Sequence, residues 1–284
     1  MDMNHSIDEL GKRINESWMN TVSVRADLDR ALLAIDRLEE RLLILQASFA
    51  TAAEAQAETS RVATLWETVE LSFQEEFRGP SDLIKERLSA YLSDVLAVVG
   101  DGGDVLDIGC GRGDWLELLL ENGISATGVD TDPGSVARCA DKGLDVRLED
   151  AGDFLASAES DSHAVVTAFH VVEHLPLEGL MSLLREALRI LRPGGVLIME
   201  TPNPQNFLVA THNFFLDPTH IRPIPPALLS FLAAELGFVR VEARFLHRAE
   251  ASVDEAEKVK VEMLPGPLRH ALTAAADYAV IAFR

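Results

Sequence analysis

The sequence predicts an α/β fold in which a mostly parallel β-sheet lies between helices and a long helical segment precedes it. From residue 104 onward, short apolar runs rich in β-branched residues alternate with helical patterns. This alternation is typical of parallel strands joined by right-handed crossovers. Residues 1–75 contain a single glycine and no proline, which favours helix over the whole stretch. A strand, a glycine-rich turn and a helix follow one another at residues 104–120, and the sheet is expected to be organised around them.

Composition limits the class of protein. At 284 residues with 48% hydrophobic content, the chain can bury one full α/β core and have residues left over. No apolar run is long enough to span a membrane and the N-terminus lacks the apolar core of a signal peptide, so we expect a cytoplasmic protein. The two cysteines lack C-x-x-C spacing, so no disulfide framework is expected. A net charge of −21 argues against a nucleic-acid partner held through its phosphates.

The N-terminal segment carries a heptad-like seam of apolar residues, spaced by three or four and flanked by charges, which is typical of a coiled coil. The seam consists of Leu28, Leu32, Ile35, Leu38, Leu42, Leu45 and Phe49. A lone helix would expose this stripe, so residues 1–78 are expected to form a coiled-coil oligomerisation segment and the chain a homo-oligomer. Gly79-Pro80 breaks the helical pattern, and residues 79–284 are expected to form the second domain.

The second domain contains an ordered series of expected elements. A helix over residues 81–98 precedes the first strand, and Pro193-Gly194-Gly195 is expected to end a later helix before the fifth strand. Strands are expected near residues 104–108, 126–130, 144–148, 164–169 and 196–200, with two more within 238–248 and 277–284. Helices are expected near residues 114–122, 133–142, 178–192 and 225–236.

The turn at residues 109–113 has the spacing G-x-G-x-G. Side chains at its three glycines would keep a nucleotide-like ligand from approaching the backbone at the end of a strand. Asp107 precedes the turn and Asp114 follows it, and these two charges disfavour a pyrophosphate and favour a cationic ligand. Asp130 ends the next expected strand, where a carboxylate can hold both hydroxyls of a ribose.

The D-x-G-x-G-x-G run with the later Asp130 resembles motif I and the acidic ribose-binding residue of class I S-adenosylmethionine-dependent methyltransferases. The resemblance implies a Rossmann-like sheet of seven strands, with one antiparallel strand in the late pair, and S-adenosylmethionine as cofactor. It also implies that Asp150 reaches the adenine amino group, with Ala151 against the ring. Capping of the following helix is an equally good role for Asp150, and the two roles are compatible. The expected cofactor-binding residues are Asp107, Gly109, Cys110, Gly111, Gly113, Asp130, Asp150, Ala151 and His170.

His170, Glu173 and His174 follow the fourth expected strand at i, i+3 and i+4, so they would share one face of a helix. The order H-x-x-E-H also occurs in zinc peptidases, but its place at the end of a nucleotide-type sheet makes that interpretation poor. Two catalytic roles stay open: a general base, His174 or His220, beside Glu173, or a divalent metal held by His170, Glu173, His174 and His220. Plain packing at the top of the sheet is the alternative, above all for His170.

A long segment rich in proline and asparagine follows the fifth strand, over residues 201–226. Long loops at the carboxyl ends of such strands usually hold substrate. Its side chains suit a polar, hydroxyl-rich acceptor; they are Asn203, Asn206, His212, Asn213, Asp217, His220 and Arg222. A loop made rigid by its prolines for packing alone is the alternative.

Residues 77–238 resemble the methyltransferase domain of the O-antigen chain-terminating methyltransferase/kinase family, through AFHVVEHL, LRPGGVLIMETPNP and NFFLDPTHIRPIP. No protein-kinase signature follows here, and the coiled coil is N-terminal. The resemblance implies O-methylation of a glycan or glycolipid in lipopolysaccharide biosynthesis, alongside glycan-assembly enzymes and peripheral to the inner membrane. The acceptor group is a sugar hydroxyl or a phosphate. A small-molecule or RNA O-methyltransferase, a nicotinamide dehydrogenase and a non-catalytic coiled-coil scaffold are the alternatives.

Overall fold

The structure is a computed structural model that describes residues 79–100, 103–248 and 265–284, all within the unit Leu71–Arg284. The expected coiled coil at residues 1–78, and the oligomer that it would form, lie outside the described residues and stay predictions. Among the described residues, no helix combines the length and apolar character needed to cross a membrane.

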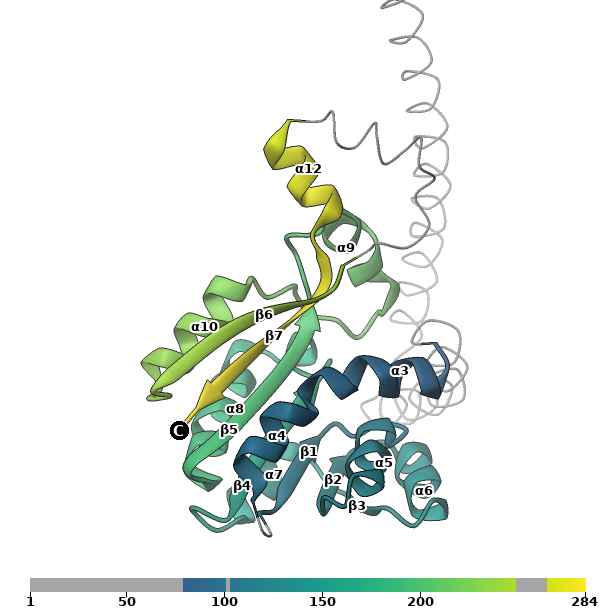
Figure 1. Ribbon diagram of the computed structural model, residues 1–284, viewed down its shortest axis with the longest axis vertical. Helices are drawn as coiled ribbons and strands as arrows, with labels where there is room; N and C mark the ends of the chain where they lie inside the picture. The colour runs from purple at the N-terminus through teal and green to yellow at the C-terminus, as the bar shows by residue number, and fades with distance from the viewer. Residues whose placement is uncertain (1–78, 101–102, 249–264) are drawn as a thin grey trace, which may run out of the picture. The chain divides into compact units, whose positions relative to one another are not determined.

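Seven strands form one sheet in the order β3-β2-β1-β4-β5-β7-β6 (Figure 1). The strands are β1 Val105–Ile108, β2 Ala126–Asp130, β3 Asp145–Leu148, β4 His163–Phe169, β5 Leu191–Pro202, β6 Arg240–Arg248 and β7 Ala275–Phe283. Strands β1 to β5 run parallel to one another, whereas β7 runs antiparallel to both β5 and β6. The predicted sheet, with one antiparallel strand in its late pair, is confirmed.

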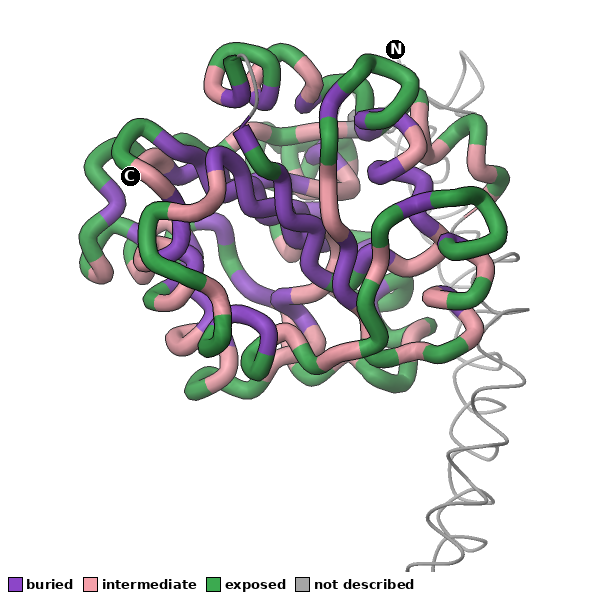
Figure 2. The backbone as a smooth tube through the Cα atoms, turned by 90° about the horizontal axis from the view of Figure 1, so that it is seen from below, coloured by how far each residue is buried: buried purple, intermediate pink, exposed green. Residues whose placement is uncertain are grey.

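Helices cover both faces of the sheet. The α-helices within the described residues are α3 Ser81–Leu88, α4 Leu92–Val99, α5 Asp114–Glu121, α6 Pro133–Asp141, α7 Ala151–Ser157, α8 Leu177–Ile190, α9 Phe207–Thr211, α10 Pro226–Glu235 and α12 Gly266–Thr273. The 3-10 turns are η1 Ser89–Tyr91, η2 Val172–His174 and η3 Asn213–Leu216. Side chains of α7, α8 and α10 join one buried apolar cluster, and those of α3, α4 and α5 join another. Figure 2 shows the central strands buried between these layers. The two-faced burial explains why β4 and β5 are continuously apolar in sequence.

One expected turn lies inside a strand. Helix α8 ends at Ile190 and β5 begins at Leu191, so Pro193-Gly194-Gly195 does not separate the two elements as predicted. Instead, the pairing of β5 with β4 shifts register between His163 and Val165, and the extra residues of β5 form a bulge there. Gly194 has φ +80°, which a glycine adopts without a steric penalty. The strand therefore starts five residues earlier than the 196–200 that the sequence predicted.

The topology gathers the functional residues at one edge of the sheet. Parallel strands place their carboxyl ends at the same edge. Because β7 runs in the opposite direction, its first residues meet this edge too, and Asp277 pairs with Pro202 at the end of β5. The ends of β1, β4 and β5 and the start of β7 are thus brought together from positions far apart in the chain.

Candidate active site

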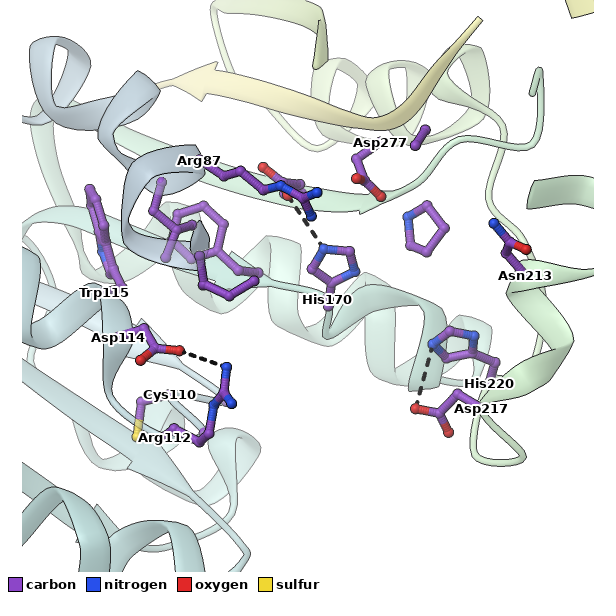
Figure 3. Close-up of a pocket in the computed structure, with 18 of the residues that line it drawn as sticks. Arg87, Cys110, Arg112, Asp114, Trp115, His170, Asn213, Asp217, His220 and Asp277 are labelled. Carbon is purple, nitrogen blue, oxygen red and sulfur yellow. Dashed lines mark hydrogen bonds and ion pairs between the residues drawn. The ribbon is translucent and has the colours of Figure 1, made fainter. Parts of the chain in front are cut away.

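A cavity of about 430 Å³ opens at this edge of the sheet (Figure 3). Its size is within the range of small-molecule sites. The glycine turn after β1 forms one part of the wall, His170 after β4 lies near the middle, and Asp217 and His220 from the long loop lie at the other end. Helix α3 contributes Arg87, and β7 contributes Asp277.

The backbone amides of the glycine turn are bonded inside the protein. The N–H groups of Gly109 and Cys110 both donate to the Val129 carbonyl, at 2.8 and 3.2 Å. The Gly111 N–H donates to Asp130 Oδ2 at 2.8 Å, and the Gly113 N–H to the Cys110 carbonyl at 2.9 Å. An anion-binding turn directs such amides at its ligand. These bonds therefore disfavour a pyrophosphate site, and with it the nicotinamide dehydrogenase alternative.

The three glycines of the turn have different roles. Gly109, Gly111 and Gly113 all have positive φ, at 67°, 49° and 78°. Only Gly109 and Gly111 line the cavity. A Cβ on Gly113 would lie 2.7 Å from Cys139 Sγ and 2.7 Å from Leu144 Cδ1, atoms of the protein core. Gly113 therefore allows close packing of α6 on the turn, not close approach of a ligand, which corrects the role expected for it.

Replacing Gly113 with alanine is expected to lower the free energy of unfolding by about 3 kcal/mol, because a left-handed alanine costs about 1 kcal/mol and the overpacked core costs more. Gly123 provides a matched control: its φ is 73°, and a Cβ there has no atom within 4 Å. Gly123→Ala should therefore show the conformational cost alone, about 1 kcal/mol. Urea unfolding of both variants measures the difference, and equal losses would contradict the packing role.

The two acidic residues that flank the turn differ in their environment. The Asp114 carboxylate accepts hydrogen bonds from the Ser81 hydroxyl and from Arg112 Nη2, the latter at 3.1 Å, so its charge is already compensated. Asp107 is only 2% exposed and faces the cavity. Burial raises the pKa of Asp107 to about 7, although the hydrogen bond from Thr167 opposes this shift. Asp107 is therefore the carboxyl that a cationic ligand would stabilise, and the expected joint action of Asp107 and Asp114 is corrected.

Asp130, Asp150 and Ala151 lie at the carboxyl ends of β2 and β3, outside the cavity lining. The Asp130 carboxylate accepts the N–H groups of Gly111 and Asp132, at 2.8 and 2.9 Å, and so connects the turn to the end of β2. Asp150 caps α7 by accepting the Gly152 and Asp153 N–H groups at 2.8 and 3.3 Å, as one of its two expected roles requires. The expected contacts of these residues with the ribose and adenine stay predictions.

The H-x-x-E-H segment is not an α-helix. His170 adopts φ +56° and only Val172–His174 form a 3-10 turn, so the three side chains do not share a helical face as the spacing suggested. His170 instead lies between two carboxylates, with Nδ1 3.3 Å from Glu173 Oε1 and Nε2 3.3 Å from Glu200 Oε1. Burial lowers the pKa of His170, but the bonds to Glu173 and Glu200 outweigh it and hold this pKa well above its usual value. Both ring nitrogens of His170 thus face carboxylate oxygens.

His220 and His174 are held in a defined orientation. His220 Nδ1 is 2.6 Å from the Phe214 carbonyl, which can only accept, so Nδ1 carries the proton and Nε2 carries the lone pair. His220 Nε2 lies 3.8 Å from Glu173 Oε1 and 3.9 Å from Asp217 Oδ2. Thr219 Oγ1 donates to Asp217 and contacts His174 Nδ1 at 2.9 Å, which places the proton of His174 on Nδ1 as well. Both rings are therefore held at Nδ1, His220 by the Phe214 carbonyl and His174 by the Thr219 hydroxyl.

The four residues expected to hold a metal fall into two groups. Glu173, His174 and His220 offer ligand atoms within 4.8 Å of one another, whereas His170 groups with Glu200 and Asp277 instead. Glu173 is fully buried, and its Oε1 faces His170 Nδ1 at 3.3 Å and His220 Nε2 at 3.8 Å without a well-formed hydrogen bond, so this oxygen could also hold a cation. Burial raises the pKa of Glu173, but the contacts with His170 outweigh it and lower this pKa, so the carboxylate is ionised. The Glu173–His174–His220 centre therefore fits a divalent metal without His170.

The polar residues of the long loop divide between structure and cavity. Asn203 donates to the Ala275 carbonyl at 2.9 Å, and Asn206 to the Ala274 carbonyl at 2.7 Å, so both connect the loop to β7. They are buried and do not line the cavity, so the expectation that they bind an acceptor is wrong. Asn213, Asp217 and His220 do line it. His212 and Arg222 lie outside the lining.

Sequence reasoning missed several residues of the cavity. They are Arg87, Trp115, Phe169, Glu200 and Asp277. Glu200 and Asp277 carry a signal that could have revealed them, because each is an acidic residue inside an otherwise apolar strand. Burial raises the pKa of Asp277 to about 6, with Arg87 and His170 opposing the shift. Arg87 carries no such signal, since a cation on an amphipathic helix is ordinary.

Comparison with known proteins gives matches to methyltransferases. Residues 81–243 match the family model of a methyltransferase domain. A probable S-adenosylmethionine-dependent methyltransferase of Mycolicibacterium smegmatis is 34% identical over 48% of this chain and 52% of that protein. A ubiquinone biosynthesis O-methyltransferase of Pseudomonas entomophila is 33% identical over 38% of this chain and 49% of that protein. This chain thus spans about half the length of these curated relatives.

A solved structure is similar over a larger part of the chain. It is a SAM-dependent methyltransferase from Archaeoglobus fulgidus, 33% identical to this chain. The match has a TM-score of 0.66 and covers 76% of this chain and 99% of the other.

Proposed function

This chain belongs to the S-adenosylmethionine-dependent methyltransferase family, and from that premise we propose that it methylates an oxygen of a polar, hydroxyl-rich acceptor. The observation that carries this proposal is that one cavity has two chemically different ends. The glycine turn, with Cys110 and Arg112, lies at one end, and His220 with Asp217 lies at the other (Figure 3). Asp107, which also lines the cavity, directly precedes Ile108 and the glycine turn in the chain. A methyl donor and an acceptor bound at these two ends would face each other across the region of His170. Such orientation supplies much of the rate of a two-substrate transfer.

The residues of the cofactor end fit a cationic nucleoside. When bound, S-adenosylmethionine supplies a methyl group on a positively charged sulfur. An acceptor oxygen would attack that methyl carbon in line, and the sulfur would leave as the thioether of S-adenosylhomocysteine. Asp107 provides a buried carboxyl toward the positive charge of the donor, and its ionised form becomes favoured when that charge arrives. Asp130 is assigned to the ribose and Asp150 with Ala151 to the adenine.

At the acceptor end, His220 is the proposed general base. Its Nε2 lone pair faces the cavity region between Glu173 and Asp217, at 3.8 and 3.9 Å. A proton taken from the acceptor hydroxyl would be held on Nε2, and the two carboxylates would stabilise the resulting imidazolium. His174 is the second candidate base, and its Nδ1 is held by Thr219 Oγ1 at 2.9 Å.

The same residues could instead bind a divalent metal. Glu173, His174 and His220 would hold it, with a carboxylate oxygen of Glu173 as one ligand. A metal there would lower the pKa of an acceptor hydroxyl without a separate base. The two uses differ in one respect that can be measured, because a chelator abolishes turnover only in the second.

A glycan-type acceptor, as in O-antigen modification, is our first candidate. Support comes from the resemblance of residues 77–238 to the O-antigen enzymes and from the polar lining residues Asn213, Asp217 and Asp277. A quinol-type small molecule is the second candidate, because a relative is named a ubiquinone biosynthesis O-methyltransferase. The apolar lining residues Val209, Phe214 and Leu216 would suit a quinol ring. An RNA acceptor is disfavoured by the charge of −21.

The proposal extends to the rest of the chain. The seam at residues 28–49 supports a homo-oligomer formed through the N-terminal segment. A glycan or glycolipid acceptor implies work beside glycan-assembly enzymes in the cytoplasm, peripheral to the inner membrane.

Methyl-transfer assays with the full chain test the function. Labelled S-adenosylmethionine is offered with an O-antigen-type oligosaccharide, its terminal phosphate ester, a catechol or a short RNA, each with and without a chelator. We expect label in one of the two sugar arms. Label in the catechol arm alone would favour the quinol over the glycan as acceptor. Label in the RNA arm alone would contradict the inference from the net charge that RNA is disfavoured. No label in any arm would contradict the proposed acceptors, and if the methyl donor does not bind either, the scaffold alternative would be favoured.

A further inference from the structure

Tyr91 forms an unexpected buried contact with the cavity wall. It belongs to η1, is 0% exposed, and packs on Phe169 with ring centroids 5.2 Å apart. Its hydroxyl donates to Glu200 Oε2 near the end of β5. Burial and the neighbouring Glu200 carboxylate raise the pKa of the Tyr91 phenol well above its usual value, so the hydroxyl remains a donor. An element that precedes the sheet is thereby bonded to an acidic residue of the cavity.

The contact continues as far as the Glu173–His174–His220 centre. Glu200 Oε1 lies 3.3 Å from His170 Nε2, and Glu173 Oε1 lies 3.3 Å from His170 Nδ1. The other oxygen of Glu173 accepts from the Thr201 hydroxyl at 2.9 Å. Each carboxylate is therefore held by a hydroxyl on one oxygen and by His170 on the other. Successive contacts therefore lead from Tyr91 through Glu200, His170 and Glu173 to Thr201.

The backbone at His170 indicates that this arrangement is enforced. His170 has φ +56°, a left-handed conformation that a residue other than glycine adopts at a cost, and its N–H donates to the Glu200 carbonyl at 2.8 Å. Such conformations persist where the surroundings over-determine them, and they occur often at functional sites. Glu200 thus holds His170 through both its side chain and its backbone.

We propose that Tyr91 and Glu200 are positioning residues for methyl transfer, which act through His170 to fix the Glu173 carboxylate in the Glu173–His174–His220 centre. The proposal rests on the function proposed above. Loss of the Tyr91 hydroxyl removes one hydrogen bond from the buried Glu200 carboxylate, which weakens the hold of Glu200 on His170. Residues that orient catalytic side chains in this way typically change activity about 10–100-fold when replaced.

Tyr278 offers a matched control on the same sheet. It is also 0% exposed, and its hydroxyl donates to the Ile224 carbonyl at 2.8 Å. Tyr91→Phe and Tyr278→Phe each remove one buried hydroxyl and one hydrogen bond from a tyrosine. Any general effect on folding should therefore be similar, whereas only the Tyr91 bond leads to Glu173.

The test compares these two variants in the full chain, with the acceptor that the wild-type protein methylates fastest in the panel above. Tyr91→Phe should lower kcat about tenfold and leave KM for the acceptor and the affinity for S-adenosylhomocysteine nearly unchanged. Tyr278→Phe should keep the wild-type kcat. Glu200→Gln, which keeps the size of the side chain, should lower kcat at least as much as Tyr91→Phe. Equal kcat values for the two tyrosine variants would overturn the proposal.

A second measurement needs no acceptor, so it remains informative if no compound in the panel is methylated. Nitrogen-15 spectra of the histidine rings, with His170 assigned through the signal lost in His170→Asn, report on the contacts of its two ring nitrogens with Glu173 and Glu200. That signal should shift or broaden in Tyr91→Phe and stay in place in Tyr278→Phe. An unchanged signal in Tyr91→Phe would refute the chain of contacts. A panel without methylated product, together with the expected spectra, would refute the proposed function alone.

Discussion

Glu173→Gln is expected to lower methyl-transfer turnover about 100-fold or more, the usual effect of removing a charged group from an acid–base or metal centre. Glu173 is fully buried and contacts His170 at 3.3 Å and His220 at 3.8 Å. Glutamine keeps the volume of the side chain and can still accept the Thr201 hydroxyl. Its neutral amide cannot stabilise an imidazolium or act as a carboxylate ligand. Affinity for S-adenosylhomocysteine should stay nearly unchanged, because Glu173 does not line the cofactor end of the cavity.

Steady-state kinetics with the best acceptor of the panel, together with calorimetry of S-adenosylhomocysteine binding, measure the two effects. Glu178→Gln is the matched control, since Glu178 is an exposed carboxylate in the first turn of α8 and touches no part of the site. Glu178→Gln should leave both quantities unchanged. If Glu173→Gln turns over at the wild-type rate, the Glu173–His174–His220 centre has no part in catalysis.

Asp130→Ala is expected to weaken S-adenosylhomocysteine binding about 100-fold, equivalent to about 2.8 kcal/mol. Two losses contribute. The assigned hydrogen bonds to the ribose hydroxyls disappear, and the Gly111 N–H loses the carboxylate that holds it at 2.8 Å. Hydrogen bonds to a charged group contribute about 1.5–3 kcal/mol each, so the sum of even partial losses reaches this magnitude.

Calorimetry with S-adenosylhomocysteine measures the change, and thermal unfolding checks that the variant remains folded. Asp145→Ala serves as the control: Asp145 begins β3, is exposed and bonds only the Thr127 hydroxyl, at 2.6 Å. It should bind the ligand like the wild type. An Asp130→Ala variant that is folded and binds with wild-type affinity would remove Asp130 from the cofactor site.

Much of the fold was predictable because it is encoded locally. Apolar runs alternate with helical patterns at short range, and this periodicity predicted all seven strands. The antiparallel direction in the late pair was implied by the resemblance to class I methyltransferases. The glycine turn and the acidic end of β2 also lie within about one β-α-β unit. The error at Pro193-Gly194-Gly195 has a physical reason as well. Those residues favour a turn, but pairing with β4 is strong enough to extend β5 through them as a bulge.

The site was predictable only in part, because spacing does not report side-chain direction. His170, Glu173 and His174 suggested one helical face, yet the left-handed backbone of His170 turns its ring away from His174 and between two carboxylates. Asn203 and Asn206 suggested an acceptor surface, yet both satisfy backbone carbonyls that precede β7 or begin it. In each instance a partner from a distant strand decided the role.

The sequence by itself therefore determined the class of the sheet, the turn that approaches the cofactor and the acidic residues beside it, since all of these depend on neighbours within a few tens of residues. Only the tertiary structure decided which charges meet at the cavity. Glu200 and Asp277 come from β5 and β7, and they meet because β7 runs antiparallel into the edge where the parallel strands end. Tyr91 reaches Glu200 from η1, 109 residues earlier in the chain. Burial at that edge then sets the pKa values and hydrogen bonds that no local pattern contains.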